Sequence, residues 1–188
     1  VQEHRRDQVA SNAAVLLFGG IETTEAMIAN AFVHLLADER QTQLVHDDPA
    51  LARRALEESL RLEPAAAVID RYTTCATRLG DAAIGERELV RLSLAGANRD
   101  PHVFPEPDRF DVLRDGLELQ VAFAHGPHVC LGMHLARLEG RVALQRTLAR
   151  LPGLRLDPGR PARIEGLVFR KPEAVHVIWD GPGATLSR

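Results

Sequence analysis

The stretch that decides the fold runs from Phe123 to Gly132 and reads FAHGPHVCLG. It is a glycine-containing loop that delivers Cys130 to the start of an apolar periodic segment, which predicts a helix over 131–151. The N-terminus of a helix favours negative charge, so this sulfur lies where a thiolate is stabilised. Gly126 permits a backbone turn that other residues avoid, and Gly132 lets the backbone approach a flat ligand closely. The loop therefore predicts a thiolate ligand site.

The composition is that of an ordinary globular protein. The 188 residues are 45% apolar and 26% charged, with a net charge of −3, and a chain of this length buries roughly 70% of its unfolded surface. The mild acidity gives no reason to expect nucleic acid as a partner. The longest apolar stretch, 13–21, is far shorter than the roughly 20 residues of a membrane span. No membrane span or leader segment is expected.

The cysteine usage argues against several site classes. Cys75 and Cys130 are the two cysteines, and no Cys-x-x-Cys pair occurs. Neither a zinc site nor a disulfide framework is expected, and a reducing, cytoplasmic setting fits best. We expect Cys75 to be a small buried hydrophobe.

Apolar periodicity predicts a long first helix. The residues that recur at three- and four-residue spacing, and that we expect on its buried face, are Val9, Ala13, Leu16, Leu17, Gly20, Met27, Ile28, Ala31 and Leu35. A short helix is expected over 40–46. Asp48-Pro49 is typical of the N-cap and first residue of a third helix, which would end near 62, before Pro64.

Beyond the third helix the pattern changes to strands. A turn is expected at Gly80-Asp81, between β-branched alternating segments. The other expected elements are strands at 68–76, 88–94, 154–156 and 175–179, and an irregular proline-rich segment at 101–107. Helices dominate, so the expected fold class is mainly α with small β-sheets, in one domain or part of one.

The first helix contains an unusual polar segment, Gly19-Gly20-Ile21-Glu22-Thr23-Thr24. Two adjacent glycines inside a helix cost about 1 kcal/mol each relative to alanine. Close helix packing would explain them, and so would room for a ligand beside them. The carboxylate of Glu22 and the hydroxyl of Thr23 favour the second explanation, because together they could relay protons to an oxygen held beside the glycines.

Two further charged motifs are weak when taken alone. Glu58 and Arg61 lie three residues apart on the third helix and so share a face; an exposed pair of this kind contributes only about 0.2–0.5 kcal/mol. Arg71 lies on an expected strand, where an arginine most often faces solvent.

The loop pattern Phe-x-x-Gly-x-His-x-Cys-x-Gly resembles the haem-binding loop of the cytochrome P-450 family. The glycine–acid–threonine helix, the Glu-x-x-Arg pair, the strand arginine and the proline-rich segment also occur in the order of that family. The resemblance spans Asn12 to about Arg150. The family domain is about twice as long as this chain, and the part that matches is its C-terminal half.

The resemblance implies a role for each motif residue. Cys130 would be the axial ligand of haem b, in a loop that begins at Phe123, and a cysteine thiolate pushes electron density onto the iron. Glu22 and Thr23 would deliver protons. Arg71 and His128 would bind the two haem propionates, which suits their chemistry as donors to carboxylates.

The resemblance also gives the Glu-x-x-Arg pair a role in the scaffold. Glu58 and Arg61 would be joined by the side chain of Arg109, from the proline-rich segment, in one buried network that supports the cysteine loop. Members of a buried network of this kind must all be satisfied, since an unpaired member is costly.

The implied protein is the haem-binding C-terminal half, residues 1–188, of a bacterial-type cytochrome P-450 whose N-terminal half is absent. The implied activity is monooxygenation, in which one oxygen atom of O2 enters a small organic substrate. A ferredoxin or flavodoxin-type protein would donate the electrons. Strand alternation turns Ile69 to the same side as Arg71, so an apolar substrate is expected. The alternative is a truncated or non-catalytic relative that acts as an activator or as a vestigial fragment.

Overall fold

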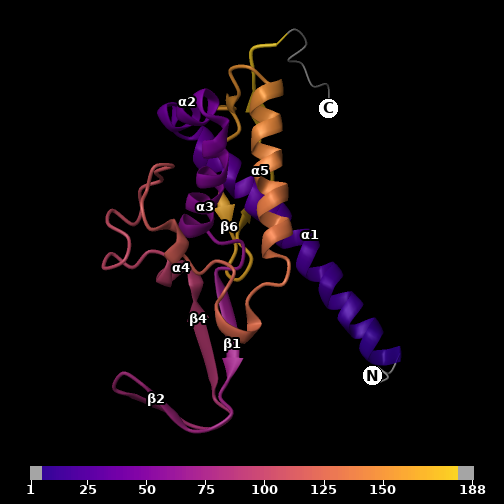
Figure 1. Cartoon of the computed structure of the whole chain (residues 1–188), viewed down its shortest axis with the longest axis vertical. Helices are drawn as coiled ribbons and strands as arrows, with labels where there is room; N and C mark the ends of the chain where they lie inside the picture. The colour runs from indigo at the N-terminus through magenta and orange to yellow at the C-terminus, as the bar shows by residue number, and fades with distance from the viewer. Residues whose placement is uncertain (1–5, 182–188) are drawn as a thin grey trace.

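The computed structural model describes residues 6–181. Figure 1 shows a body of helices with small sheets at its edges and one long helix that projects from it. The α-helices are α1 (Arg6–Leu36), α2 (Glu39–Asp47), α3 (Ala52–Leu62), α4 (Leu94–Ala97) and α5 (Met133–Arg150). Short 3-10 helices are η1 (Pro49–Leu51), η2 (Leu117–Leu119) and η3 (Gly126–His128). The predicted fold class is confirmed.

Capping residues explain where the second and third helices begin. The side chain of Asp38 accepts a hydrogen bond from the Gln41 amide at the start of α2. Asp48 does the same for the Ala50 amide, with Pro49 as the first residue of η1, which leads directly into α3. Asp48 and Pro49 thus begin a helical turn as predicted, but that turn is the 3-10 helix η1, and α3 itself begins at Ala52 without a side-chain cap.

The strands form antiparallel pairs at the edges of the helical body. The pairs within residues 6–181 are β1 (Val68–Tyr72) with β4 (Leu89–Ser93), β2 (Thr77–Leu79) with β3 (Ala82–Ile84), β5 (Arg155–Leu156) with β8 (Val177–Ile178), and β6 (Ile164–Glu165) with β7 (Lys171–Pro172). The β6–β7 pair was not predicted.

The predicted strand 68–76 is shorter in the structure, where β1 ends at Tyr72 and its pairing with the segment before β4 ends at Thr73. The Thr73 amide donates to the Glu88 carbonyl (3.0 Å), and the Arg87 amide donates to the Thr73 carbonyl (2.9 Å). The separate β2–β3 hairpin then turns at Gly80, whose φ of 57° suits glycine. That turn was predicted correctly.

The core lies where α1, α3 and α5 meet. Leu35, Leu56 and Leu144, one from each helix, are fully buried. The three helices lie close together at Gly140 of α5, where an added Cβ would lie 2.8 Å from both methyl carbons of Leu56 and 3.0 Å from Cε of Met27. Any larger residue there would have to displace the Leu56 and Met27 side chains.

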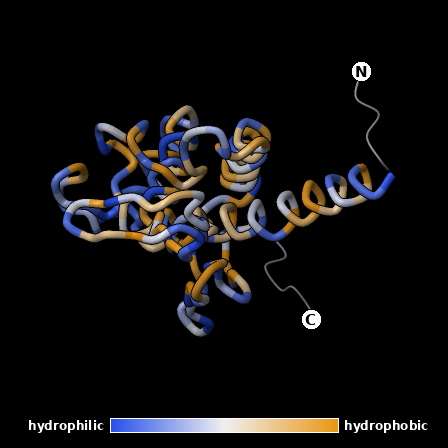
Figure 2. Tube along the Cα trace, turned by 90° about the horizontal axis from the view of Figure 1, so that it is seen from below, coloured by the Kyte–Doolittle hydropathy of each residue, from blue (hydrophilic) through white to orange (hydrophobic). Residues whose placement is uncertain are grey.

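Only the second half of α1 takes part in this core. Met27, Ala31 and Leu35 are buried as predicted, and Ile28 packs partly buried against the core. The prediction is wrong for Val9, Ala13, Leu16, Leu17 and Gly20, which are exposed. Residues 6–21 are exposed throughout because this part of α1 extends away from the body as an arm, and Figure 2 shows apolar residues along it. We call residues 6–21 the α1 arm.

Within residues 6–181, no helix combines the length and the apolar character that crossing a lipid bilayer requires.

Candidate functional site

The cysteine loop is folded back on itself directly before α5. The Cys130 amide donates to the Phe123 carbonyl (3.0 Å), which closes the loop at its two ends. The turn between them uses positive φ values at Ala124 (61°) and Gly126 (82°), followed by η3. The Cys130 carbonyl then accepts from the Met133 amide (3.3 Å), the first residue of α5. Gly132, at the N-cap position, has no side chain that could cap this helix N-terminus, and the N-terminus of a helix favours a negative group nearby.

Both cysteines are exposed and unpaired. This contradicts the expectation for Cys75, which lies between β1 and β2 on the surface instead of in the core. Cys75 would be buried only if another element covered the segment between β1 and β2. No element within residues 6–181 covers it.

Arg137 makes contacts with Phe123 and Glu57 that fix the cysteine loop to α3 and α5 and that were not predicted from the sequence. We call these contacts the clamp. The Arg137 guanidinium of α5 lies over the Phe123 ring, 4.6 Å from its centroid, and Nε of the same arginine donates to Glu57 of α3 (2.6 Å). Glu57 also accepts from Gln120, ahead of the loop (3.0 Å). The two adjacent acids Glu57-Glu58 indicate that two carboxylates lie on α3. Only Glu58 belongs to the Glu-x-x-Arg motif, so the sequence indicated no partner for Glu57. Together these contacts join the loop, α3 and α5.

Glu58 and Arg61 form a fully buried, bidentate ion pair. Arg61 Nε donates to one carboxylate oxygen of Glu58 (2.7 Å) and a terminal nitrogen donates to the other (2.9 Å). Arg61 also donates to the carbonyls of Asn98 (2.9 Å) and Pro107 (2.8 Å). The surface-pair alternative is therefore wrong, and the pair fixes the proline-rich segment against α3.

The third member of the network is Arg114, and the prediction of Arg109 is wrong. Arg114 Nε donates to Glu58 (2.9 Å), and its side chain is 9% exposed. The chain reverses at Glu106, where φ is 49°. Arg109 therefore directs its carbonyl toward Arg61 (3.2 Å), while its side chain pairs with Glu106 (3.0 Å) and Asp111 (3.5 Å) at the surface.

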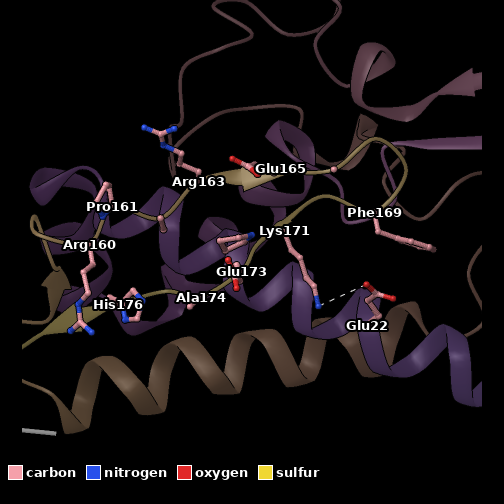
Figure 3. Close-up of a pocket in the computed structure, with 13 residues that line it drawn as sticks. Glu22, Arg160, Pro161, Arg163, Glu165, Phe169, Lys171, Glu173, Ala174 and His176 are labelled. Carbon is pink, nitrogen blue, oxygen red and sulfur yellow. Dashed lines mark ion pairs between the residues drawn. The ribbon is translucent and has the colours of Figure 1, made fainter. Parts of the chain in front are cut away.

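The glycine pair of α1 lies in open space. A Cβ added at Gly19 or Gly20 would meet no atom within 4 Å, and α1 continues through both without a break. Within the described part of the chain, close helix packing therefore does not explain them. The Thr23 hydroxyl donates back to the Gly19 carbonyl (2.5 Å), a bond typical of threonine inside a helix. Glu22 does not contact Thr23; its carboxylate lies 3.8 Å from the Lys171 amine (Figure 3).

Arg71 and His128 are exposed and have no carboxylate partner within residues 6–181. Arg71 lies on β1 and donates to the neighbouring Asp70 carbonyl (2.8 Å). His128 ends η3, two residues before Cys130. Neither side chain bonds the other or Cys130. Ile69, two residues before Arg71 on β1, is half-buried.

The donor set fits a haem group. An exposed cysteine at an uncapped helix start can supply an axial thiolate. The Cβ positions of Gly19, Gly20 and Gly132 are open, which leaves room for a flat ring. A guanidinium and an imidazole without carboxylate partners can donate to two propionates.

A family model described as cytochrome P-450 matches residues 48–161. Cytochrome P-450 107B1 of Saccharopolyspora erythraea is 46% identical over 143 residues, which cover 76% of this chain and 35% of that protein. The vitamin D(3) 25-hydroxylase of Pseudonocardia autotrophica is 41% identical over 167 residues, or 88% of this chain and 40% of that protein.

Solved structures agree. A complex of P-450 BioI with a hexadec-9Z-enoic acid-ligated acyl carrier protein superposes with a TM-score of 0.89 at 35% identity, over 95% of this chain and 46% of that one. The cytochrome P-450 CREJ superposes with a TM-score of 0.90 at 34% identity, over 96% of this chain and 45% of that one. The chain thus spans less than half the length of the relatives it matches. Because the family model covers more than half of its residues, and its helical body superposes on these structures, the chain belongs to the cytochrome P-450 family.

Proposed function

We propose that this chain is the haem-binding part of a monooxygenase that inserts one oxygen atom of O2 into a small organic molecule. The observation that carries the proposal is the loop closed between Phe123 and Cys130, which presents an exposed cysteine at the uncapped start of α5. The relatives support the reaction class, since one is a vitamin D(3) 25-hydroxylase and another a 6-deoxyerythronolide B hydroxylase.

Thiolate-bound haem supplies the activation of O2 in this chemistry. Cys130 would hold the iron through its sulfur, and Arg71 and His128 would bind the propionates. The Thr23 hydroxyl would donate a proton toward the oxygen held beside Gly19 and Gly20, and Glu22 would replace that proton. The balance is one O2, two electrons and two protons for one oxygen atom inserted and one water released.

The remaining assignments concern partners. A ferredoxin or flavodoxin-type protein is the proposed source of electrons, and a small apolar molecule the proposed substrate. The half-buried Ile69 supports the second assignment, because an apolar side chain offers no partner for a polar substrate group and leaving such a group unpaired is costly.

The two exposed cysteines provide a matched test of the ligand. The chain is loaded with haem, reduced and exposed to carbon monoxide, for wild type, Cys130→Ala and Cys75→Ala. We expect the strongly red-shifted Soret band of thiolate ligation in wild type and in Cys75→Ala, and its loss in Cys130→Ala. A band of the histidine-ligated kind in wild type, or a thiolate band that survives Cys130→Ala, would contradict the proposal. A thiolate band without turnover in the haem-loaded protein supplied with electrons and substrate would favour the non-catalytic alternative.

A further inference from the structure

Lys171 on β7 is the only lysine in the sequence, and the other 22 of its 23 basic Lys and Arg residues are arginine. Lysine and arginine are not interchangeable. An arginine presents a rigid planar fork that suits one bidentate partner, whereas a lysine presents a compact point charge on a flexible stem. A lysine can therefore share its charge between two partners, which the fork of an arginine suits less well.

The amine of Lys171 lies between two carboxylates of α1. Its Nζ is 3.3 Å from Oε1 of Glu25 and 3.8 Å from Oε1 of Glu22. The two acids are three residues apart and so lie on one helix face. The lysine side chain is 29% exposed, the least of the three. One ammonium thus serves two carboxylates, and Glu22 is the more distant of them.

Lys171 and Glu22, but not Glu25, line a cavity of about 850 Å3 between α1 and the segment 160–176. Figure 3 shows Lys171 and Glu22 directed toward each other, with Arg160 and His176 at the other end of the cavity. Arg163 and Glu165 also line it, and neither forms an ion pair with α1. Because Glu22 and Lys171 line the cavity, water that enters it can reach the Glu22 carboxylate.

Lys171 is not needed to attach β7 to the helical body. The residue before it, Arg170, pairs with Glu63 (2.5 Å), and its carbonyl accepts from the Asn30 side chain (2.9 Å). The Arg170 amide also donates to the Ala65 carbonyl (3.0 Å). The strand is therefore held by its neighbour, and the charge of Lys171 is left for another role.

We propose that Lys171 is a positioning residue for Glu22, holding its carboxylate at the cavity while Glu25 competes for the same amine. This inference rests on the proposed function, in which Glu22 takes a proton from water and passes one to Thr23. When the amine pairs with Glu22, it holds that carboxylate at the cavity in its ionised form. When the amine stays with Glu25, Glu22 takes a proton from cavity water and is free to turn toward Thr23 and pass it on.

The contact is tested without haem, because the chain has a single ε-amine. The rate at which an amine-reactive reagent modifies Lys171, located by peptide mass, is measured for wild type, Glu22→Gln, Glu25→Gln and the control Glu165→Gln. We expect Glu22→Gln and Glu25→Gln each to raise the rate about twofold or more, and Glu165→Gln to leave it unchanged. Equal rates in all four proteins would overturn the shared pairing.

The positioning role is tested in the complete haem-loaded enzyme by the fraction of electrons lost to hydrogen peroxide. We expect Lys171→Met to raise this fraction about threefold. Lys171→Arg keeps the charge but replaces the flexible point charge with a planar fork, so we expect it to restore the wild-type value only in part. Arg163→Met, which removes a cation from the same cavity, is expected to change nothing. An unchanged peroxide fraction in Lys171→Met, with the amine still protected in wild type, would overturn the proposal and leave a structural ion pair.

Failure of the proposed function would look different. In that case the thiolate spectrum is absent, or Thr23→Ala leaves the peroxide fraction at its wild-type value, whereas the protection of the Lys171 amine persists. If Lys171→Met does not fold, the amine rates and the Lys171→Arg variant still decide between the outcomes.

Discussion

His34 of α1 is a neutral histidine in the interior, surrounded by cations. Its Nδ1 lies 2.9 Å from the Ser59 hydroxyl, and its ring lies against Phe110 with centroids 5.7 Å apart. Burial, and then the charges of Arg99 and Arg61, lower the pKa of His34 from 6.5 to about 4. Burial, together with the charges of Arg99 and of Arg61, which pairs with Glu58 in the scaffold, therefore keeps a proton from this ring.

This histidine makes stability depend on pH in a defined direction. Between pH 6.5 and 4 the unfolded chain binds a proton at His34 and the folded chain does not, so stability is full above 6.5 and falls as the pH falls. The total loss expected by pH 4 is about 3 kcal/mol. Urea unfolding at pH 7 and pH 5 measures it, and His34→Gln should flatten this part of the dependence. The exposed His46→Gln is the control; the same pH dependence in wild type and His34→Gln would contradict the assignment.

The buried carboxylate of Glu58 distinguishes two arginines that look alike in sequence. Arg114 reaches Glu58 at 2.9 Å, whereas the side chain of Arg109 pairs at the surface. Removing one partner of a buried pair costs about 3–5 kcal/mol, and removing an exposed pair costs about 1 kcal/mol or less. We expect Arg114→Leu to lower the free energy of unfolding by about 3–5 kcal/mol. We expect Arg109→Leu to lower it by about 1 kcal/mol or less. Urea unfolding and haem retention measure both, and equal losses would contradict this network.

At the residue scale, local spacing was sufficient for some of the site and not for the rest. Glu58 and Arg61 lie on one helix, so three-residue spacing alone sets their side chains together. The partner that completes the pair comes from a loop whose path depends on a reversal at Glu106, and no periodic pattern records that reversal. The Glu57–Arg137 clamp joins two helices 80 positions apart in the sequence, and its formation depends on tertiary packing.

At the scale of elements, three helices carry the core and the cysteine loop together. Gly140 of α5 faces Leu56 of α3 and Met27 of α1. The clamp between Arg137 and Glu57 lies about one helical turn away on α5, beside the start of the helix that follows Cys130. Close packing at Gly140 therefore sets how near α5, and the loop before it, lies to α3.

Filling this contact should destabilise the protein even though alanine is the better helix former. Gly140→Ala gains about 1 kcal/mol in helix propensity, but its Cβ would lie 2.8 Å from both methyl carbons of the fully buried Leu56. Overpacking typically costs about 1–3 kcal/mol, so we expect a net loss of stability and weaker haem retention. The control is Gly20→Ala, where a Cβ meets nothing within 4 Å. A thermal midpoint for Gly140→Ala at or above that of Gly20→Ala would contradict the packing argument.

The elements themselves were largely predictable. Each long helix carries apolar periodicity or a capping residue, and these signals depend on a few neighbours in sequence. The short β6–β7 pair has two residues a strand, too few for an alternating pattern to be read. The burial of α1 was predicted over its whole length because periodicity marks an apolar face without saying what covers it.

At the scale of the whole molecule, the α1 arm is the main departure from a closed fold. Its apolar side chains are 56–67% exposed at Val9, Val15, Leu16, Leu17, Phe18 and Ile21. Phe18 meets Phe169 edge to face, with ring centroids 5.9 Å apart, where the arm joins the body. The relatives are more than twice as long as the aligned chain. We infer that the arm is a surface which further polypeptide covers in a complete enzyme.

The 188-residue chain expressed alone should therefore associate with itself through the α1 arm. A contiguous apolar surface of this kind is uncommon on a monomer and favours association. We expect sedimentation velocity to show oligomers that increase with concentration, and the double variant Val15→Ser, Leu17→Ser to shift the chain toward monomer. Leu79→Ser, which removes an equally exposed leucine from β2, should leave association unchanged. The arm would be excluded as the associating surface if the double variant sedimented like wild type, or if wild type were monomeric at every concentration.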